Sequence, residues 1–328
     1  MAARTGLNVC SASLRRGQVA DYSEDWGRRT PRRRVARSFV WQGFYAKLSD
    51  FRACLTGFML PLSPSLLTTL AAACLYAAAT IYQGTRLASG AKVNKRLLVM
   101  LGVLAVLAHS VSLLTHLLTP TGLALDFFSA ASLIAVAVIA LTLLACSRIP
   151  VENLLVLLFP LGALTVMLAH FAPAGTVQVI DEEPGILAHI LLSILAYGMF
   201  TIAVFQSLLL LVQDHQLKHK HPSGLIKNFP PLQTMESLLF GFLWAGWTLL
   251  SLSLISGWLF VENLFAQHLV HKTLLACLAW VVFSVLLWGR NRLGWRGHKA
   301  IRWTLAGFCL LMLAYFGSKL VREYILHI

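Results

Sequence analysis

The stretch that decides the fold lies at residues 185–213 and reads GILAHILLSILAYGMFTIAVFQSLLLLVQ. It contains no Asp, Glu, Lys or Arg. At about 1.5 Å per residue, a bilayer core of about 30 Å needs about 20 apolar residues, and this run is longer. We therefore expect a membrane-spanning helix with one histidine, His189, near its start. That histidine is either a packed, hydrogen-bonded interior side chain or a ligand.

The composition of the whole chain sets the class of protein. Of its 328 residues, 58% are hydrophobic and only 12% are charged, whereas soluble domains carry about 25% charged residues. This composition excludes a soluble domain and indicates an all-α, polytopic integral membrane bundle. The six cysteines stand singly, with no Cys-x-x-Cys pair, so they indicate neither a dithiol nor a zinc site.

The first 58 residues differ from the rest of the chain. They hold 11 Lys and Arg against 4 acidic residues, which is half of the net charge of +14. Such a leader is read as a disordered tail or as a basic arm for anionic lipid or nucleic acid. We favour a third interpretation, an upstream extension of the reading frame that the mature protein need not retain, because Met59 opens an apolar segment. The predicted domains are a basic, disordered leader at 1–58 and a membrane domain at 59–328, with no nucleic-acid partner.

Apolar segments bounded by charge, Pro or Gly follow one another through the membrane domain. They predict about eight spans, near 63–83, 97–118, 122–146, 151–171, 185–213, 236–260, 269–288 and 301–321. The loops after the first, third, fifth and seventh spans carry nearly all of the loop Lys and Arg, which the positive-inside rule places in the cytoplasm. We therefore predict a multi-pass protein of the plasma (inner) membrane, with both ends of the membrane domain extracytoplasmic.

Histidines collect at the outer ends of the predicted spans. They are His170, His189, His268, His271 and His327. Because His268 and His271 are three residues apart and Lys272 follows, these three side chains can share one helix face. His109 lies near the middle of the second span, where an imidazole must face the bundle interior and find a partner. We read it either as a helix-to-helix hydrogen bond or as a ligand or proton step.

Three motifs follow one another in the second half of the chain. They are PLQTMESLLFGFLWAGWTLLSLSLISG at 231–257, Arg290 with the GWRG turn at 294–297, and LAYFGSKLV at 313–321. In this order and spacing they resemble the CcsA and CcmC family of cytochrome c assembly proteins, most closely its YpjD-like branch. The resemblance covers residues 59–328 and implies a membrane protein that binds or moves haem rather than an enzyme that makes bonds.

The resemblance also implies which residues would hold haem. His189 matches the family histidine at the outer start of a span, and His327 matches the second outer histidine, so the two would be axial ligands of a non-covalent, b-type haem. His109 matches the histidine of an early span that is thought to hold haem within the membrane. Secondary candidates at the outer end are His268, His271, Lys272 and Trp258. Neutral imidazole is a normal axial ligand of haem iron, and we expect no other metal.

The chain departs from the family between Gly257 and Lys272. WLFVENLFAQHLVH contains only Trp258, where the family carries a Trp-rich loop that presents haem. We therefore expect haem binding or support of cytochrome c maturation, with haem and membrane proteins of that assembly as partners. One alternative is a small-solute transporter or channel with a histidine relay, although no predicted span places Asp or Glu near its middle. Another is a non-catalytic assembly partner of a membrane complex, with structural histidines.

Overall fold

The computed structural model describes residues 63–119, 122–123, 126–172, 184–218, 229–260 and 267–317. The predicted leader at 1–58, its boundary with the membrane domain and His327 lie outside these residues. Within them, eight helices are long and apolar enough to cross a membrane. The prediction of an all-α, polytopic membrane bundle is therefore confirmed.

The elements follow one another in the order of the apolar segments. They are α2 (Pro64–Ala88), α3 (Lys95–Leu117), β1 (Leu118–Thr119), β2 (Gly122–Leu123), α4 (Phe127–Cys146), η1 (Glu152–Leu154), α5 (Leu155–Phe171), α6 (Pro184–Lys218), α8 (Leu232–Phe260), α9 (Gln267–Leu293), α10 (His298–Met312) and η2 (Leu313–Gly317). The 3₁₀ turn η1 leads into α5, and the π-helical turn η2 continues α10. The two short strands pair antiparallel between α3 and α4.

The start of α4 is set by a cap and not by the beginning of the apolar run. The third predicted span began at residue 122, whereas residues 122–123 form β2 and α4 begins at Phe127. The carboxylate of Asp126 accepts a hydrogen bond from the backbone amide of Ser129 at 3.1 Å. An aspartate in this position satisfies one of the amides that a helix start leaves free, so the helix begins after it.

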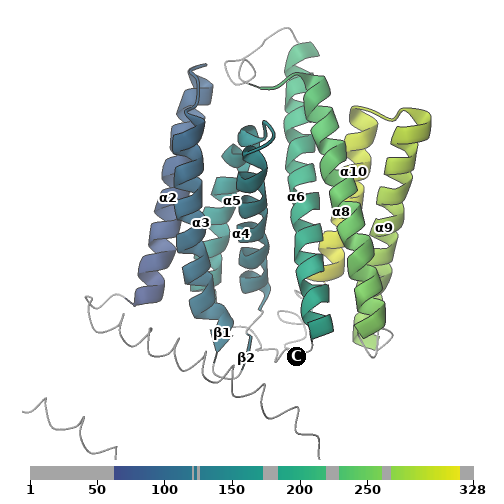
Figure 1. The fold of residues 1–328 in the computed structure, drawn as a ribbon, viewed down its shortest axis with the longest axis horizontal. Coiled ribbons are helices and arrows are strands. Elements are labelled where there is room, and N and C mark those ends of the chain that lie inside the picture. The colour runs from purple at the N-terminus through teal and green to yellow at the C-terminus, as the bar shows by residue number, and fades with distance from the viewer. Residues whose placement is uncertain are drawn as a thin grey trace, which may run out of the picture. The chain divides into compact units, whose positions relative to one another are not determined.

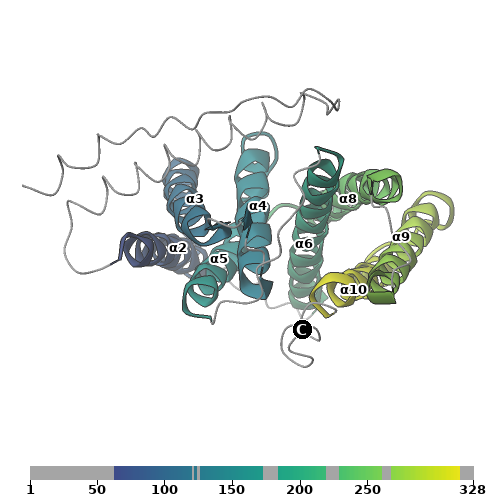
Figure 2. The ribbon, with the colours of Figure 1, turned by 90° about the horizontal axis from the view of Figure 1, so that it is seen from below.

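The eight long helices of the described part form two groups of four (Figure 1). One group consists of α2, α3, α4 and α5, and the other consists of α6, α8, α9 and α10. Figure 2, which looks along the helices, shows that α4 and α6 are the neighbours that join the two groups. The most extensive helix-to-helix contact in the described part is the one between α6 and α8.

Two stacked phenylalanines lie where the four helices of the second group meet. The rings of Phe200 on α6 and Phe283 on α9 are nearly parallel, with centroids 4.0 Å apart. A Cβ atom on Gly246 of α8 would come within 3.0 Å of Phe200, and one on Gly307 of α10 within 2.7 Å of Phe283. The two glycines therefore give the stack the space it needs, as small residues commonly do between membrane helices.

Two pairs of tryptophan and serine link α8 to α9. The indole N–H of Trp247 donates to the hydroxyl of Ser284, and that of Trp280 donates to the hydroxyl of Ser251, each at 2.8 Å. Each serine hydroxyl in turn donates to the tryptophan carbonyl one turn earlier on its own helix. Because a bilayer core offers no water, this reciprocal arrangement satisfies both indoles inside the protein.

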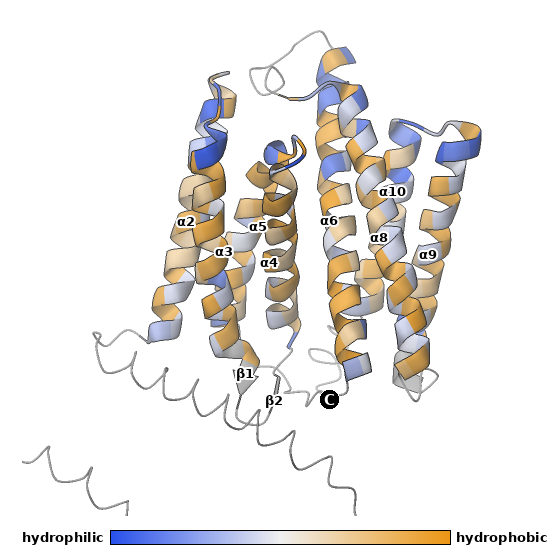
Figure 3. Ribbon diagram, in the orientation of Figure 1, coloured by the Kyte–Doolittle hydropathy of each residue, from blue (hydrophilic) through white to orange (hydrophobic). Residues whose placement is uncertain are grey.

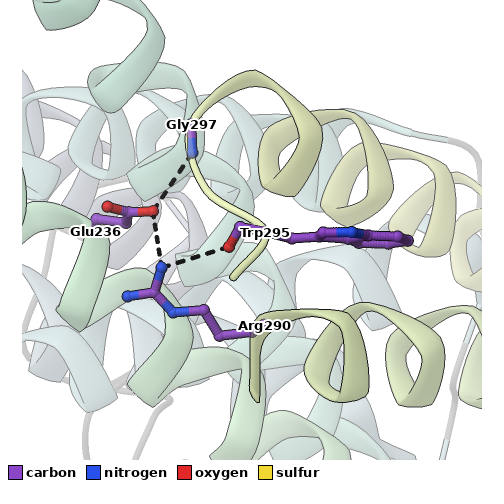
Figure 4. Close-up of polar contacts among 4 residues, drawn as sticks. All are labelled: Glu236, Arg290, Trp295 and Gly297. Carbon is purple, nitrogen blue, oxygen red and sulfur yellow. Dashed lines mark hydrogen bonds and ion pairs between the residues drawn. The ribbon is translucent and has the colours of Figure 1, made fainter. Parts of the chain in front are cut away.

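A partly buried ion pair fixes the turn between α9 and α10 (Figure 4). One carboxylate oxygen of Glu236, near the start of α8, accepts from the Arg290 guanidinium at 3.2 Å and from the Gly297 amide at 3.3 Å. Arg290 also donates to the Trp295 carbonyl and lies over the ring of Phe240. The GWRG turn is thus tied to α8. We did not predict Glu236, although an acidic residue in an apolar helix signals a basic partner.

The described Lys and Arg side chains lie almost entirely at one end of the helices, the upper and hydrophilic end in Figure 3. They are Arg86, Lys92, Lys95, Arg96, Arg148, Lys218, Arg290, Arg292, Arg296, Lys299 and Arg302. Lys272, at the start of α9, is at the opposite end. The positive-inside rule predicts that the basic end faces the cytoplasm. We call it the inner end and the opposite one the outer end.

Single cysteines test this orientation in a variant without the native cysteines. We expect His271→Cys, at the start of α9, to react with a membrane-impermeant maleimide in intact spheroplasts. Arg292→Cys, at the other end of the same helix, should react only after the membrane is opened, because the basic end faces the cytoplasm. Labelling in the opposite pattern would reverse the predicted sidedness of every helix.

Substitution of Glu236 tests the ion pair of Figure 4. Glu236→Gln leaves the Arg290 guanidinium partly buried without its counter-charge, which typically lowers the free energy of unfolding by about 3 kcal/mol. The melting temperature in detergent should fall accordingly. The exposed Arg292 provides the matched control, since Arg292→Gln removes one charge at the same end and should change stability by no more than about 0.5 kcal/mol. Equal effects of the two substitutions would contradict the structural role of Glu236.

Candidate functional site

His189 lies in the second turn of α6 and contacts α8 near the outer end of both helices. Its Nδ1 atom is 2.8 Å from the backbone carbonyl of Ser253 and 3.3 Å from the hydroxyl of Ser256. A carbonyl oxygen can only accept, so Nδ1 carries the proton and donates. The Ser256 hydroxyl donates to the same carbonyl at 2.9 Å. This contact selects the tautomer of His189 in which Nε2 is unprotonated.

The Nε2 atom of His189 has no hydrogen-bonding partner among the described residues. Within the described part of the chain, no group therefore engages the lone pair of Nε2. A histidine whose one nitrogen donates to a carbonyl while the other keeps its lone pair has the arrangement typical of metal-ligating histidines. Chemically, this imidazole can coordinate a metal or accept a proton.

Small residues of α8 make the space for this imidazole. A Cβ atom on Gly257 would lie 2.9 Å from Cε1 and 3.1 Å from Nδ1 of the His189 ring. One turn further in, the Ser193 hydroxyl donates to the His189 carbonyl and lies 2.7 Å from the Ser253 hydroxyl. We did not predict these neighbours. The signal for them was the spacing of Ser253, Ser256 and Gly257, which places all three on one face of α8.

The other residues predicted at the outer end are Trp258, His268, His271, Lys272 and His327. Trp258 follows Gly257 on α8 and is 74% exposed. His271 is exposed and Lys272 is half-buried in the first turns of α9. The side chain of His268 and all of His327 lie outside the described part. The structure thus brings Trp258, His271 and Lys272 to the same end as His189, without a hydrogen bond to its ring.

His109 occupies a different environment, inside the group formed by α2 to α5. Its side chain is fully buried. Nδ1 lies 3.2 Å from the phenol oxygen of Tyr76 on α2, and Nε2 lies 2.7 Å from the hydroxyl of Ser132 on α4. The Tyr76 ring meets the imidazole edge-on and packs against Phe159 of α5. Both ring nitrogens of His109 are therefore engaged by hydroxyl groups.

A second set of polar contacts lies nearer the outer end of the same group. The hydroxyl of Thr69 on α2 is 2.7 Å from that of Ser112 on α3 and 3.4 Å from Nδ1 of His170 on α5. Together with the contacts of His109, these hydrogen bonds connect all four helices of the first group. The polar side chains in this group thus serve as links between helices.

The first five residues of the third sequence motif, Leu313–Gly317, form the π-helical turn at the outer end of α10. Just before this turn, the carbonyl of Leu311 accepts a hydrogen bond from the phenol of Tyr197 on α6. Aromatic rings from α4, α6 and η2 gather around it, namely Phe127, Tyr197, Tyr315 and Phe316. Turns of this kind are frequent at functional sites. Tyr197 is eight residues, about 12 Å, inside from His189 on α6.

Comparison with known proteins gives one family and several relatives. The family described as Cytochrome C assembly protein matches residues 97–326. The Inner membrane protein YpjD of Escherichia coli strain K12 is 32% identical over 233 residues, which are 70% of this chain and 88% of its own. A 28.8 kDa protein of Azospirillum brasilense is 36% identical over 163 residues, 48% of this chain and 59% of its own.

A more distant relative is Protein HemX of Brevibacillus brevis, 24% identical over 162 residues, which are 48% of this chain and 60% of its own. No solved structure matches the chain significantly. The family match includes the helices that carry His109 and His189 and all three sequence motifs. Because it spans well over half of the sequence, the chain belongs to the cytochrome c assembly protein family.

Proposed function

We propose that this protein binds and hands on haem in cytochrome c biogenesis, with His189 as an axial ligand of the iron. The observation that carries the proposal is the hydrogen bond from Nδ1 of His189 to the Ser253 carbonyl, while Nε2 has no partner among the residues that the structure describes. Imidazole ligates iron in this protonation state, and a hydrogen bond from its other nitrogen fixes the orientation of the ring.

A single imidazole suits haem better than a bare metal ion. The described residues include no group of three or more His, Cys, Asp or Glu side chains that could hold a metal ion. The macrocycle of haem brings the equatorial ligands itself, and bound haem would supply a redox-active iron at this end of the membrane. In this proposal, the residues around His189 only hold and orient its imidazole. Ser253 and Ser256 keep the proton on Nδ1, and Gly257 leaves room for the ring.

The setting of this activity follows from the relatives. We infer that the chain resides in the inner membrane, because the related protein of Escherichia coli is named an inner membrane protein and eight helices here can span a bilayer. The description of the family supports a role in cytochrome c assembly, with other membrane proteins of that assembly as partners. The protein would bind haem without covalent attachment and would form no bonds itself.

The second axial ligand in this proposal is His327. It matches the second outer histidine of the family and lies outside the described residues. The side chains proposed to contact the edge of the haem are His268, His271, Lys272 and Trp258. The exposed ring of Trp258 offers an apolar surface next to Gly257, and the 258–271 segment is shorter than the loop that the family resemblance leads us to expect.

A transporter with a histidine relay has less support. The acidic residues of the described part lie at the ends of helices, and they are Asp126, Glu152, Asp214 and Glu236. Carboxylates that couple transport to protons or ions usually lie near the middle of the bilayer. The polar contacts of His109 also end at Ser132 and Tyr76 within the described part, without leading to the inner end.

His109 fits haem poorly. Coordination of iron by either nitrogen would require the loss of its hydrogen bond to Tyr76 or to Ser132, in a place with no exposure for the ring. We therefore propose that His109 is a link between α2, α3 and α4, and that haem is held at the outer end of α6 and α8.

Replacement of His189 tests the haem site. We expect the wild-type protein, expressed with ample haem and purified in mild detergent, to show a Soret band. His189→Gly should retain about tenfold less haem, since the ligand is lost, and imidazole added to the buffer should partly restore the band. Gly257→Ala should also weaken retention by about tenfold, because the added methyl displaces the ring, and loss of an orienting neighbour commonly has this cost.

A histidine at the inner end provides the control for this experiment. His298→Gly removes an exposed imidazole far from the outer end and should leave the Soret band and its response to imidazole unchanged. Membrane insertion of all variants should be normal, because insertion depends on apolar length. A wild-type protein without any Soret band would contradict the proposal, as would equal haem loss in His298→Gly and His189→Gly.

Replacement of His109 separates the two histidines. His109→Leu removes both hydrogen bonds and leaves the hydroxyls of Tyr76 and Ser132 unpaired. We expect the free energy of unfolding in detergent to fall by about 1–2 kcal/mol, the upper range for hydrogen bonds between membrane helices. The position of the Soret band and the haem content should stay as in the wild type. Loss of haem from His109→Leu with unchanged melting would instead make His109 a ligand.

A further inference from the structure

A groove lies between the inner ends of α3 and α4. The two helices touch at Gly102, where a Cβ atom would lie 2.8 Å from the Leu143 side chain. Between this contact and the inner end there is a cavity of about 410 Å³. Among the residues that line it are Lys95, Arg96, Val99, Met100 and Leu143. The groove thus has cations at its inner end and apolar side chains below them.

The charges around this groove are only partly neutralised within the protein. Lys95 pairs with Glu152, with 3.4 Å between Nζ and Oε1. Arg96 is exposed, as is Arg148, which follows the end of α4. The guanidinium group of neither arginine forms a hydrogen bond or ion pair within the described part of the chain. Three cations against one carboxylate leave a positive surface that an anion can occupy.

The lower part of the groove faces the lipid. Met100 is 54% exposed, and the membrane-spanning segment of α3 begins at Lys95. The cations therefore lie at the depth of the headgroups, while the apolar wall begins one turn deeper in the hydrocarbon. Along the groove, positive charge at the inner end is followed by apolar surface deeper in the bilayer. A phospholipid has the same order, with a charged phosphate followed by apolar acyl chains.

We propose that this groove binds one anionic phospholipid of the cytoplasmic leaflet. Its phosphate contacts Arg96 and Lys95, and an acyl chain lies along Val99 and Met100. Basic pockets between membrane helices on the cytoplasmic side bind anionic headgroups by this combination of contacts. A free phosphate ion would use the cations alone and would gain nothing from the apolar wall. The proposal is independent of haem, since the groove lies at the opposite end from His189.

Arginines elsewhere at the inner end provide a comparison. Arg290 already has a carboxylate partner in Glu236, and Arg292 is exposed but does not line the groove. Arg292→Gln therefore removes the same charge at the same end of the membrane without touching the site. Any general attraction of a basic surface for anionic lipid should respond equally to Arg96→Gln and Arg292→Gln.

The test measures lipid binding to the full chain. The protein is purified, delipidated and placed in nanodiscs of phosphatidylcholine with increasing phosphatidylglycerol. Native mass spectrometry counts the phosphatidylglycerol that stays bound, and thermal melting reports its effect on stability. We expect one retained phosphatidylglycerol and a higher melting temperature for the wild type. Arg96→Gln should weaken this binding about fivefold, as expected for one basic contact, and Arg292→Gln should change it less than twofold.

Two further samples distinguish the parts of the ligand. Met100→Trp fills the apolar part of the groove and should also reduce retention, although all cations remain. Inorganic phosphate, added in place of lipid, should give no rise in melting temperature. The proposal fails if Arg96→Gln and Arg292→Gln weaken binding equally, if Met100→Trp retains the lipid like the wild type, or if inorganic phosphate stabilises as much as phosphatidylglycerol.

Discussion

A bilayer core gives a polar side chain no water to bind, so each such side chain must find its partner within the protein, on its own helix or on another. The contacts of His109, the paired tryptophans of α8 and α9, and the hydroxyls of Thr69 and Ser112 all satisfy this constraint. These bonds link helices within each of the two groups. His189 differs from them, because its Nδ1 atom is satisfied by α8, whereas its Nε2 atom has no hydrogen-bonding partner in the described part of the chain.

The position of α6 explains why that helix carries His189, whose Nε2 atom has no partner among the described residues. α6 contacts α4 in the first group and both α8 and α10 in the second, so it carries the connection between the groups. Phe200 and Tyr197 secure it to α9 and α10. At its outer end, Gly185 lies against the Phe260 ring of α8, and one turn further in the His189 ring lies against Gly257 and two serines of α8. The imidazole is therefore held by its Nδ1 edge against α8.

The sequence predicts the helices well, since apolar length alone decides what spans a bilayer. The basic ends and the outer position of His189 also follow from counting along the chain. The hydrogen-bonding partners of the polar side chains cannot be found by such counting. His109 bonds to residues 33 and 23 positions away, and Glu236 pairs with an arginine 54 residues later; neither separation leaves a local pattern. The start of α4 was missed because Asp126 caps a helix inside what looked like a continuous apolar run.

His109 and His189 illustrate what sequence can and cannot decide. Each is a histidine in an apolar span, and the family resemblance assigns both to haem. Their surroundings distinguish them. Both nitrogens of His109 form hydrogen bonds to hydroxyls of two other helices, whereas the described residues bond only Nδ1 of His189, chiefly through a carbonyl. If haem is held at the outer end alone, the first group of helices acts on it through the contacts of α4 with α6 and with η2. Its role would then be to support α6, and its buried polar links would serve the haem site by keeping that support rigid.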